Sequence, residues 1–168
     1  VDGLLFKYAH FYGSYDFLGD SKKWYRNEIR IIKNDPQIKS YRDAQGFRKA
    51  GRKLNVKSLD ATVFHYGWVR HPKYQMAKVL EANKLWHSDD YIEQKFDADA
   101  DFDYTQVDSI ARFEGSHPAV MTERIASVNW HFDRDPSIKS FSLKLKFIYL
   151  VEKLTGWRIG EYKNYKIV

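Results

Sequence analysis

The chain has 168 residues, of which 43% are hydrophobic and 17% aromatic, and its formal net charge is +6. This length supports one domain with a substantial core, and the aromatic content excludes a disordered chain. Because cysteine is absent, disulfide frameworks and zinc–thiolate sites are excluded, and a reducing compartment is the default expectation. The positive charge favours anionic partners, without choosing between nucleic acid, acidic lipid and phosphorylated small molecules.

Strand patterns dominate the front of the chain, up to residue 96. The segment GLLFKYAHFYGSY combines β-forming residues with a closing glycine and predicts a first strand. KKWYRNEIRIIKN alternates in polarity, which places Arg26 and Arg30 on one strand face and Ile29 and Ile31 on the other. KSLDATVFHY predicts a third strand, which runs into the sequence His-Tyr-Gly-Trp.

A helix is predicted directly after these strands. Pro72 suits the first turn of a helix, where its missing N–H is not needed. Met76, Val79 or Leu80, and Trp86 then give an apolar stripe at helical spacing.

The acidic run DADADFD, residues 97–103, separates the front from a back part with helix patterns. Ser116 can cap a helix whose first turn holds Pro118. A second helix begins after Ser142 and ends at Gly156, and its predicted apolar side is formed by Leu143, Phe147, Leu150, Val151 and Leu154. The aromatic, basic tail GWRIGEYKNYKIV is predicted to be an ordered extension.

These patterns predict an α+β fold. We expect a short mixed β-sheet from the front part with helices packed on it, and a helical C-terminal part. The expected division is a strand-rich part at residues 1–96 and a mostly helical extension, packed on it, at residues 97–168.

His65 is the first candidate for chemistry, because it stands near a strand end, where loops build sites. Neutral imidazole is a common ligand of divalent metals. The alternative is a partly buried histidine that bonds to the backbone. His71, six residues on, is expected at the surface, and the pair matches no compact metal motif.

Arg26, Arg30 and Lys33 are the second candidate. Two arginines on one strand face lie about 7 Å apart and suit a diphosphate. A cross-strand salt ladder on a solvated face is the alternative. Lys78, on the helix after Pro72, suits a phosphate oxygen, although a solvated lysine is the ordinary interpretation.

The segment SYRDAQGFRKAGRK is the third candidate. Tyr41, Arg42 and Arg48 provide the aromatic and polar groups by which proteins bind sugars, and Asp43 is a candidate general base for an acceptor hydroxyl. Asp60 is a poorer candidate because it lies in mid-strand. A polar loop with ordinary turn chemistry is the alternative. The acidic run has the D-x-D spacing of Mg²⁺ ligands, but a solvated loop is the preferred interpretation.

Six segments, taken in order, resemble the second half of a bacterial family 2-like glycosyltransferase. They are GLLFKYAHFYGSYDF, WYRNEIRIIKN, SYRDAQGFRKAGRKL, DATVFHYGWVRHP, RFEGSHPAVM and LTGWRIGEYKNYK. The resemblance implies a GT-A fold and transfer of a sugar from a nucleotide-sugar donor to an acceptor hydroxyl on a glycan or a lipid-linked molecule. It also implies a role in lipopolysaccharide or other surface-glycan synthesis and a cytoplasmic location, with peripheral contact at the inner membrane face left open.

The resemblance assigns roles to individual residues. His65 corresponds to a ligand of the divalent cation, Mn²⁺ or Mg²⁺, that bridges the donor diphosphate, and Lys78 to a diphosphate contact. Asp43 remains the candidate base. Donor and acceptor binding is expected of Arg26, Arg30, Lys33, Tyr41, Arg42, Arg48, Trp68 and Lys78.

The sequence departs from the family pattern at its start. We expect the 168 residues to lack the nucleotide-binding half and its D-x-D strand, and the acidic run comes too late to replace them. We therefore expect these residues alone to be inactive as a transferase.

Two other interpretations stay open. The arginines, tyrosines and tryptophans also suit a module that binds single-stranded nucleic acid, a partner that the transferase does not need. A metal hydrolase would use His65, His71 and the acidic run. The basic last helix, with Lys139, Lys144, Lys146 and Lys153, suits an anionic surface, although packing of its stripe on the domain is the ordinary outcome.

Overall fold

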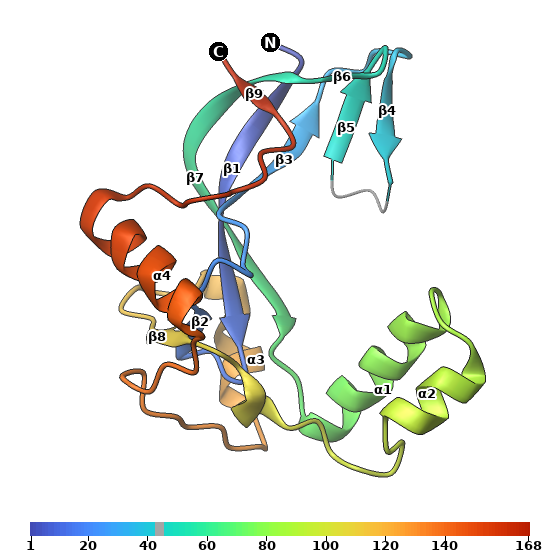
Figure 1. Cartoon of the computed structure of the whole chain (residues 1–168), viewed down its shortest axis with the longest axis vertical. Helices are drawn as coiled ribbons and strands as arrows, with labels where there is room; N and C mark the ends of the chain where they lie inside the picture. Colours follow the sequence, from blue (N-terminus) through green and yellow to red (C-terminus); the bar gives the residue numbers. More distant parts are fainter. Residues whose placement is uncertain (43–45) are drawn as a thin grey trace. The chain divides into compact units, whose positions relative to one another are not determined.

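The computed structural model describes residues 1–42 and 46–168. The protein is a mixed α+β structure, with strands and helices interleaved along the chain (Figure 1). The strands are β1 (Gly3–Tyr12), β2 (Phe17–Gly19), β3 (Asn27–Ile32), β4 (Ile38–Tyr41), β5 (Gly46–Lys49), β6 (Arg52–Lys53), β7 (Asn55–Trp68), β8 (Ile110–Arg112) and β9 (Lys166–Ile167). The α-helices are α1 (Pro72–Lys84), α2 (Asp89–Lys95), α3 (Thr122–Ala126) and α4 (Leu143–Thr155), with 3-10 turns at Tyr104–Gln106 and Ala119–Met121.

The chain forms two compact units that are discontinuous in sequence. Unit 1 comprises residues 1–9, 21–65 and 141–168, and unit 2 comprises residues 10–20 and 66–140. Strands β1 and β7 each contribute to both units. The predicted boundary at residue 97 falls inside unit 2, because α4 and the tail belong with the front strands rather than with the acidic run.

Unit 1 is built on β1. Strand β3 pairs antiparallel with it from Gly3↔Ile32 to Lys7↔Asn27, β7 lies on its other side, and β9 pairs parallel with the start of β7. Strands β4, β5 and β6 form a separate antiparallel sheet. The core is aliphatic and contains Leu5, Ile29, Ile38, Leu54 and Val56.

The predicted alternation along β3 is wrong after Ile29. The register shifts between Leu4 and Leu5 of β1, because Leu4 pairs with Ile31 and Leu5 pairs with Ile29. Arg30, which lies between the two isoleucines in β3, is therefore an extra, bulged residue. A bulge inverts the phase of the side chains beyond it. As a result Ile32 packs on the core, while Ile31 is 52% exposed.

Helix α4 has the predicted ends but presents a different face to unit 1. The Ser142 hydroxyl accepts a hydrogen bond from the Leu145 N–H at 3.4 Å, and Gly156 closes the helix at φ 72°. Ile148 is the buried residue of α4. The side predicted to pack is exposed instead, with Phe147 at 63% and Leu154 at 76%.

The C-terminal tail is ordered, as predicted. Lys166 donates its backbone N–H to Leu54 and Val168 donates to Val56, which adds β9 to the edge of β7. Tyr165 packs against the aliphatic core. The back of the chain therefore contributes a strand to this sheet, which the expectation of a sheet from the front part did not include.

Unit 2 is aromatic in its interior. Strand β2 pairs with the end of β1 at Phe11↔Leu18 and with β8, so a second strand from the back of the chain joins the sheet. Gly13, at φ 73°, turns the chain after β1, and a side chain there would overlap the ring of Phe132. Large buried side chains of unit 2 include Phe11, Tyr12, Phe17 and Tyr104.

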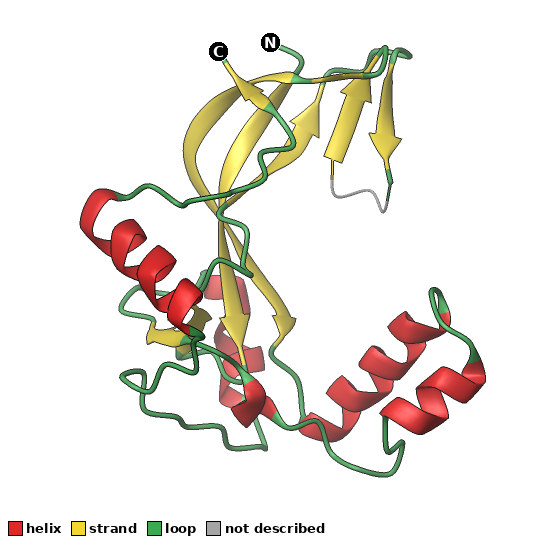
Figure 2. Cartoon of the chain, viewed as in Figure 1, coloured by secondary structure: helices red, strands yellow, loops and turns green. Residues whose placement is uncertain are grey.

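The helices of unit 2 match the prediction only in part (Figure 2). Helix α1 begins at Pro72 as predicted, but Gln75 is its buried residue, and Trp86 lies beyond its end at 72% exposure. Ser116 does not cap a helix: a 3-10 turn follows Pro118, and the short α3 begins only at Thr122. Residues 97–142 are therefore less helical than predicted. The acidic run at residues 97–103 forms an exposed loop, which is the interpretation that the sequence favoured.

Candidate functional site

The first part of the candidate site is an aromatic row in unit 1. His65 lies near the end of β7, and its ring centroid is 5.6 Å from that of Tyr8 on β1. The Tyr8 ring is in turn 5.1 Å from the ring of Tyr25, just before β3. The guanidinium of Arg30 lies 6.0 Å from the Tyr8 ring centroid. Neighbouring strands thus bring His65 and Arg30, both predicted site residues, to the same tyrosine.

The tyrosines of this row keep their protons at neutral pH. Burial, followed by the nearby Glu28 carboxylate, raises the pKa of Tyr8. Burial, followed by the Glu28 charge, also raises the pKa of Tyr25. Both hydroxyl groups therefore stay protonated at neutral pH, and each already has a hydrogen-bond partner within this row. Glu28 itself accepts from Arg30 at 3.2 Å.

A small pocket adjoins this row, and we call it the tyrosine pocket. Its volume is about 110 Å³, which equals a few water molecules at about 30 Å³ each. Three phenols, two amides and a carboxylate give it a mixed aromatic and polar lining. It is lined by Tyr25, Asn27, Glu28, Ile29, Tyr162, Asn164 and Tyr165.

The C-terminal tail connects the tyrosine pocket with the predicted acceptor segment. Arg48 of β5 donates to Asn164 Oδ1 at 2.5 Å and to the Tyr162 hydroxyl at 3.4 Å. Its guanidinium also lies 4.0 Å from the ring centroid of Tyr41. This approach requires a glycine at Gly46, because a Cβ there would overlap the Asn164 amide. Tyr41 and Arg48, predicted to bind together, are thus brought together.

Two further predicted residues of this segment are Arg42 and the candidate base Asp43. Arg42 adopts a left-handed conformation with φ 58°, and its guanidinium lies 5.3 Å from the Tyr41 ring. Asp43, the candidate base, lies outside the described residues. The other candidate, Asp60, is bound to Lys7 at 2.6 Å, and this hydrogen bond lowers its pKa. An exposed carboxylate with a lowered pKa is a weak base at neutral pH.

Arg26 has partners other than a diphosphate. Its guanidinium binds both carboxylate oxygens of Glu161 at 3.0 Å and donates to the Gly156 carbonyl at 3.2 Å. Behind it, Arg158 binds Glu152 at 2.6 Å and the Trp24 carbonyl at 2.5 Å. These contacts hold the tail against the segment before β3. Sequence spacing did not show them, since Arg26 and Glu161 are 135 residues apart.

Lys33 stands apart from this cluster. It is exposed at the end of β3, and its backbone N–H donates to the Asp2 carbonyl at 2.9 Å. Within the described part of the chain, its side chain makes no contact that would support the predicted binding role.

In unit 2, the predicted residues Trp68 and Lys78 come together. The Lys78 ammonium donates to the Gly67 carbonyl at 2.5 Å and lies 5.7 Å from the Trp68 ring centroid. Burial, followed by the charge of Arg70, lowers the pKa of Lys78. The Lys78 side chain is nevertheless exposed, and an ammonium has three donors, so it can still contact an anionic oxygen.

His117 is a histidine that sequence reasoning did not single out. Nε2 lies 3.1 Å from the Tyr15 carbonyl, which can only accept, so Nε2 carries the proton. In the neutral ring, Nδ1 then accepts a hydrogen bond from the Tyr66 hydroxyl, at 2.9 Å. The ring also packs 5.0 Å from Phe11 and 4.9 Å from Phe113. Both nitrogens are engaged within unit 2, so His117 has a structural role.

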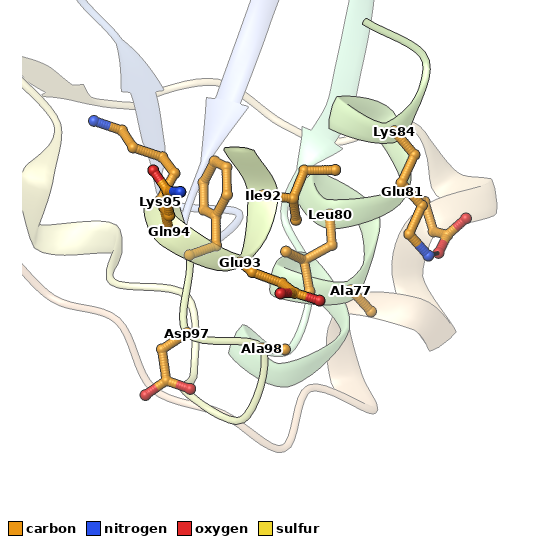
Figure 3. A pocket seen from close by; sticks show the side chains of 11 residues that line it. Ala77, Leu80, Glu81, Lys84, Ile92, Glu93, Gln94, Lys95, Asp97 and Ala98 are labelled. Atoms are coloured by element: carbon orange, nitrogen blue, oxygen red, sulfur yellow. Dashed lines mark hydrogen bonds and ion pairs between the residues drawn. The ribbon is translucent and has the colours of Figure 1, made fainter. Parts of the chain in front are cut away.

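Two further hollows lie in unit 2. A broad pocket of about 740 Å³ separates α1 from α2, with Leu80 and Ile92 among acids and lysines of both helices (Figure 3). A second hollow, of about 340 Å³, includes Asp16, Arg112 and Trp130 in its lining. Neither contains a residue predicted for the site.

Among residues 1–42 and 46–168, no group of three His, Cys, Asp or Glu side chains is arranged to hold a metal ion. Within the same residues, no helix has the length and apolar character needed to cross a membrane.

Comparison of the chain with protein-family models, with curated proteins and with solved structures gives no match. The resemblance to family 2-like glycosyltransferases therefore depends on the six sequence segments alone.

Proposed function

We propose that these residues form the acceptor-side part of a glycosyltransferase of GT-A type. It would move a sugar from a nucleotide-sugar donor to an acceptor hydroxyl, in the synthesis of a surface glycan. The observation that carries the proposal is the tyrosine pocket beside the His65–Tyr8–Tyr25 row. Sugars are bound through apolar ring faces and through polar groups that pair with hydroxyls, and this pocket, at about 110 Å³, supplies both for one edge of a sugar.

The geometry suggests a division of roles. Tyr25, which lines the pocket and is 38% exposed, would offer its ring to an apolar face of the sugar. Asn164 and Glu28 would accept from its hydroxyls. Tyr41, held by Arg48, would extend the binding surface along a longer acceptor. Asp43 remains the proposed base.

The divalent cation of the resembled family does not fit the described residues by themselves. His65 is a single candidate ligand, and among these residues it belongs to no group of three His, Cys, Asp or Glu side chains that could hold a metal ion. A D-x-D motif outside them would have to supply the others, so the binding roles of the tyrosines, Asn164 and Glu28 do not depend on a metal. The role that stays proposed for His65 is that of one ligand in the full-length polypeptide.

A binding measurement tests the acceptor role. Saturation-transfer NMR with a panel of monosaccharides and bacterial oligosaccharides should show contact with at least one of them. Tyr162→Ala should weaken that contact by about two- to ten-fold, because Tyr162 lines the tyrosine pocket. Tyr74→Ala is the matched control, since Tyr74 is similarly exposed at 62% and lies in unit 2. Absence of saccharide contact, or equal loss in both variants, would reject the acceptor site.

An activity measurement tests the transferase role. The full-length polypeptide should release a nucleoside diphosphate from one of a panel of nucleotide sugars when Mn²⁺ or Mg²⁺ is added. His65→Ala should reduce this release strongly, whereas His87→Ala should not, because His87 stacks on Tyr91 in unit 2. Unchanged release in His65→Ala would remove the ligand assignment. A salt-dependent gel shift with single-stranded oligonucleotides, without any nucleotide-sugar turnover, would favour the nucleic-acid alternative.

A further inference from the structure

Helix α4 carries an exposed apolar stripe along its whole length. Four side chains at positions i, i+4, i+7 and i+11 form it, and each is more than half exposed. They are Leu143 at 85%, Phe147 at 63%, Leu150 at 55% and Leu154 at 76%. A helix of 13 residues is about 20 Å long. Contiguous apolar surface of this kind marks an interaction site rather than scattered surface residues.

Lysines flank the stripe on both sides. At about 100° per residue, Lys144 lies about 90° from the stripe centre on one side, and Lys146 and Lys153 lie about 70° to 90° away on the other. Lys153 also rests 5.1 Å from the ring centroid of Tyr149. The exposed half of α4 is therefore apolar in its middle and cationic at both edges.

The opposite side of α4 is fixed to unit 1. Glu152, the only acidic residue of the helix, lies on this side and binds the buried Arg158 at 2.6 Å. Ile148 is buried there as well. Because these contacts already seat the helix, the stripe is not the surface by which α4 holds to unit 1.

A tryptophan follows the helix directly. Trp157, 64% exposed, stands next to the Gly156 C-cap. Its ring has an apolar body and one N–H, a combination that is enriched where proteins meet the headgroup region of a membrane.

We propose that α4 is a membrane-docking helix that lies in the plane of an anionic lipid bilayer. The stripe would enter the boundary between headgroups and acyl chains, while Lys144, Lys146 and Lys153 bind lipid phosphates. A second copy of the chain fits this face less well. Two such faces in contact would set lysines against lysines, with no acid on that half of the helix to compensate. This proposal does not depend on the proposed transferase function.

Vesicle co-sedimentation tests the docking. The purified protein should bind vesicles of phosphatidylcholine that contain about 30% phosphatidylglycerol, and should bind pure phosphatidylcholine much less. Binding should weaken as salt is raised, because the Debye length shortens. Phe147→Glu should reduce binding about ten-fold or more. The double variant Lys144→Gln/Lys146→Gln should reduce it about 25-fold, at about five-fold for each lysine.

Matched controls separate docking from a general loss of apolar or charged surface. Leu85→Glu changes a leucine of similar exposure, 75%, outside α4 and should leave binding unchanged. Lys57→Gln removes an exposed lysine of β7 and should reduce binding far less than the double variant. The tryptophan emission should shift to the blue on anionic vesicles, and Trp157→Phe, but not Trp86→Phe, should abolish the shift.

Three results would overturn the proposal. One is no binding to the anionic vesicles at low salt. Another is binding that Phe147→Glu and Leu85→Glu weaken equally. The last is a concentration-dependent dimer in sedimentation velocity that Phe147→Glu dissolves while vesicles are not bound, which would assign the stripe to a second copy. The substituted positions are exposed, so circular dichroism should show folded variants and keep each result interpretable.

Discussion

The two compact units are stabilised by different chemistry. The core of unit 1 is small and aliphatic, and its C-terminal tail is held by paired charges, in which Arg26 binds Glu161 and Arg158 binds Glu152. Unit 2 instead stacks rings, with Phe11 4.8 Å from Tyr66. The difference indicates which kind of substitution should destabilise each unit most. Unit 1 should respond to the loss of a charge partner, and unit 2 to the loss of ring volume.

The difference also bears on the proposed function. In unit 2 the histidine His117 has both nitrogens engaged by Tyr66 and Tyr15, so its tyrosine neighbours complete a core. In unit 1 the neighbours of His65 lead to the tyrosine pocket, where amides and a carboxylate are also present. A histidine beside tyrosine therefore has a structural role in one unit and a proposed binding role in the other.

The largest effect is expected from Phe11→Ala in unit 2. Phe11 is fully buried and contacts the rings of Tyr66, Phe113 and His117. Removing its ring should lower the free energy of unfolding by about 3 to 5 kcal/mol, because the cavity cannot collapse completely. Urea denaturation measures the loss. Trp86→Ala, at an exposed position, should change it by no more than about 0.5 kcal/mol.

Hydrogen–deuterium exchange of the same variant tests whether the units are separate. Peptides from residues 104–113 should exchange faster in Phe11→Ala, while peptides from residues 46–60 in unit 1 should be much less affected. Equal acceleration in both sets would show that the two cores unfold as one, and the comparison between them would fail.

A smaller effect is expected from Glu152→Ala in unit 1. The substitution leaves Arg158, only 9% exposed, without the carboxylate that it binds through two nitrogens. An uncompensated buried charge should cost about 3 kcal/mol of unfolding free energy. The control is Glu81→Ala, which breaks the exposed pair with Lys84 and should have no measurable effect. If both substitutions are equally mild, the tail of unit 1 does not depend on its charge pairs.

Local patterns predicted the ends of several elements correctly. Gly13 closes β1, Pro72 begins α1, and Ser142 and Gly156 bound α4. Each of these signals acts within a few residues, through a turn conformation or a cap. They do not depend on the rest of the fold, which is why the sequence alone reveals them.

Features that depend on distant partners were predicted wrongly or not at all. The bulge in β3 follows from its register with β1, and periodicity within one strand cannot show it. The orientation of α4 follows from the pairing of Glu152 with Arg158 and from the burial of Ile148. Hydrophobic spacing found the apolar stripe of α4 but not the fact that it faces outward.

The residues of the candidate site also fall into those that local sequence patterns could predict and those that depend on distant partners. The sequence alone could identify His65 as a candidate site residue, because a strand end is a local feature. It could identify Tyr41 and Arg48 because they lie in one short segment. Tyr8, Glu28, Tyr162 and Asn164 could not, because their proximity arises from strand pairing and from a tail more than 100 residues away from β5.

The smallest effect is expected from Glu161→Gln, and it depends on pH. Burial raises the pKa of Glu161, but the hydrogen bond and charge of Arg26 outweigh it and leave the pKa below the ordinary 4.5. A carboxyl group with a lower pKa in the folded state stabilises the fold above its unfolded pKa, and this contribution is lost as the pH falls through the folded value. At neutral pH, the free energy of unfolding of the wild type should therefore exceed that of Glu161→Gln by about 1 kcal/mol. The difference is small because the Arg26 side chain is 37% exposed.

Below about pH 4.5 the two stability curves should converge, because the wild-type carboxyl group becomes neutral like the amide. Urea denaturation between about pH 7 and pH 3 measures the convergence, and exchange of the Lys166 amide, which is bonded to Leu54, reports on the tail directly. Asp103→Asn in unit 2 is the matched control for a carboxyl group whose lowered pKa comes mainly from hydrogen bonds to Thr105 and Gln106. It should converge with wild type on acidification as well, but without faster exchange at Lys166. A difference between wild type and Glu161→Gln that stays constant over this pH range would mean that Arg26 holds the tail without help from the charge of Glu161.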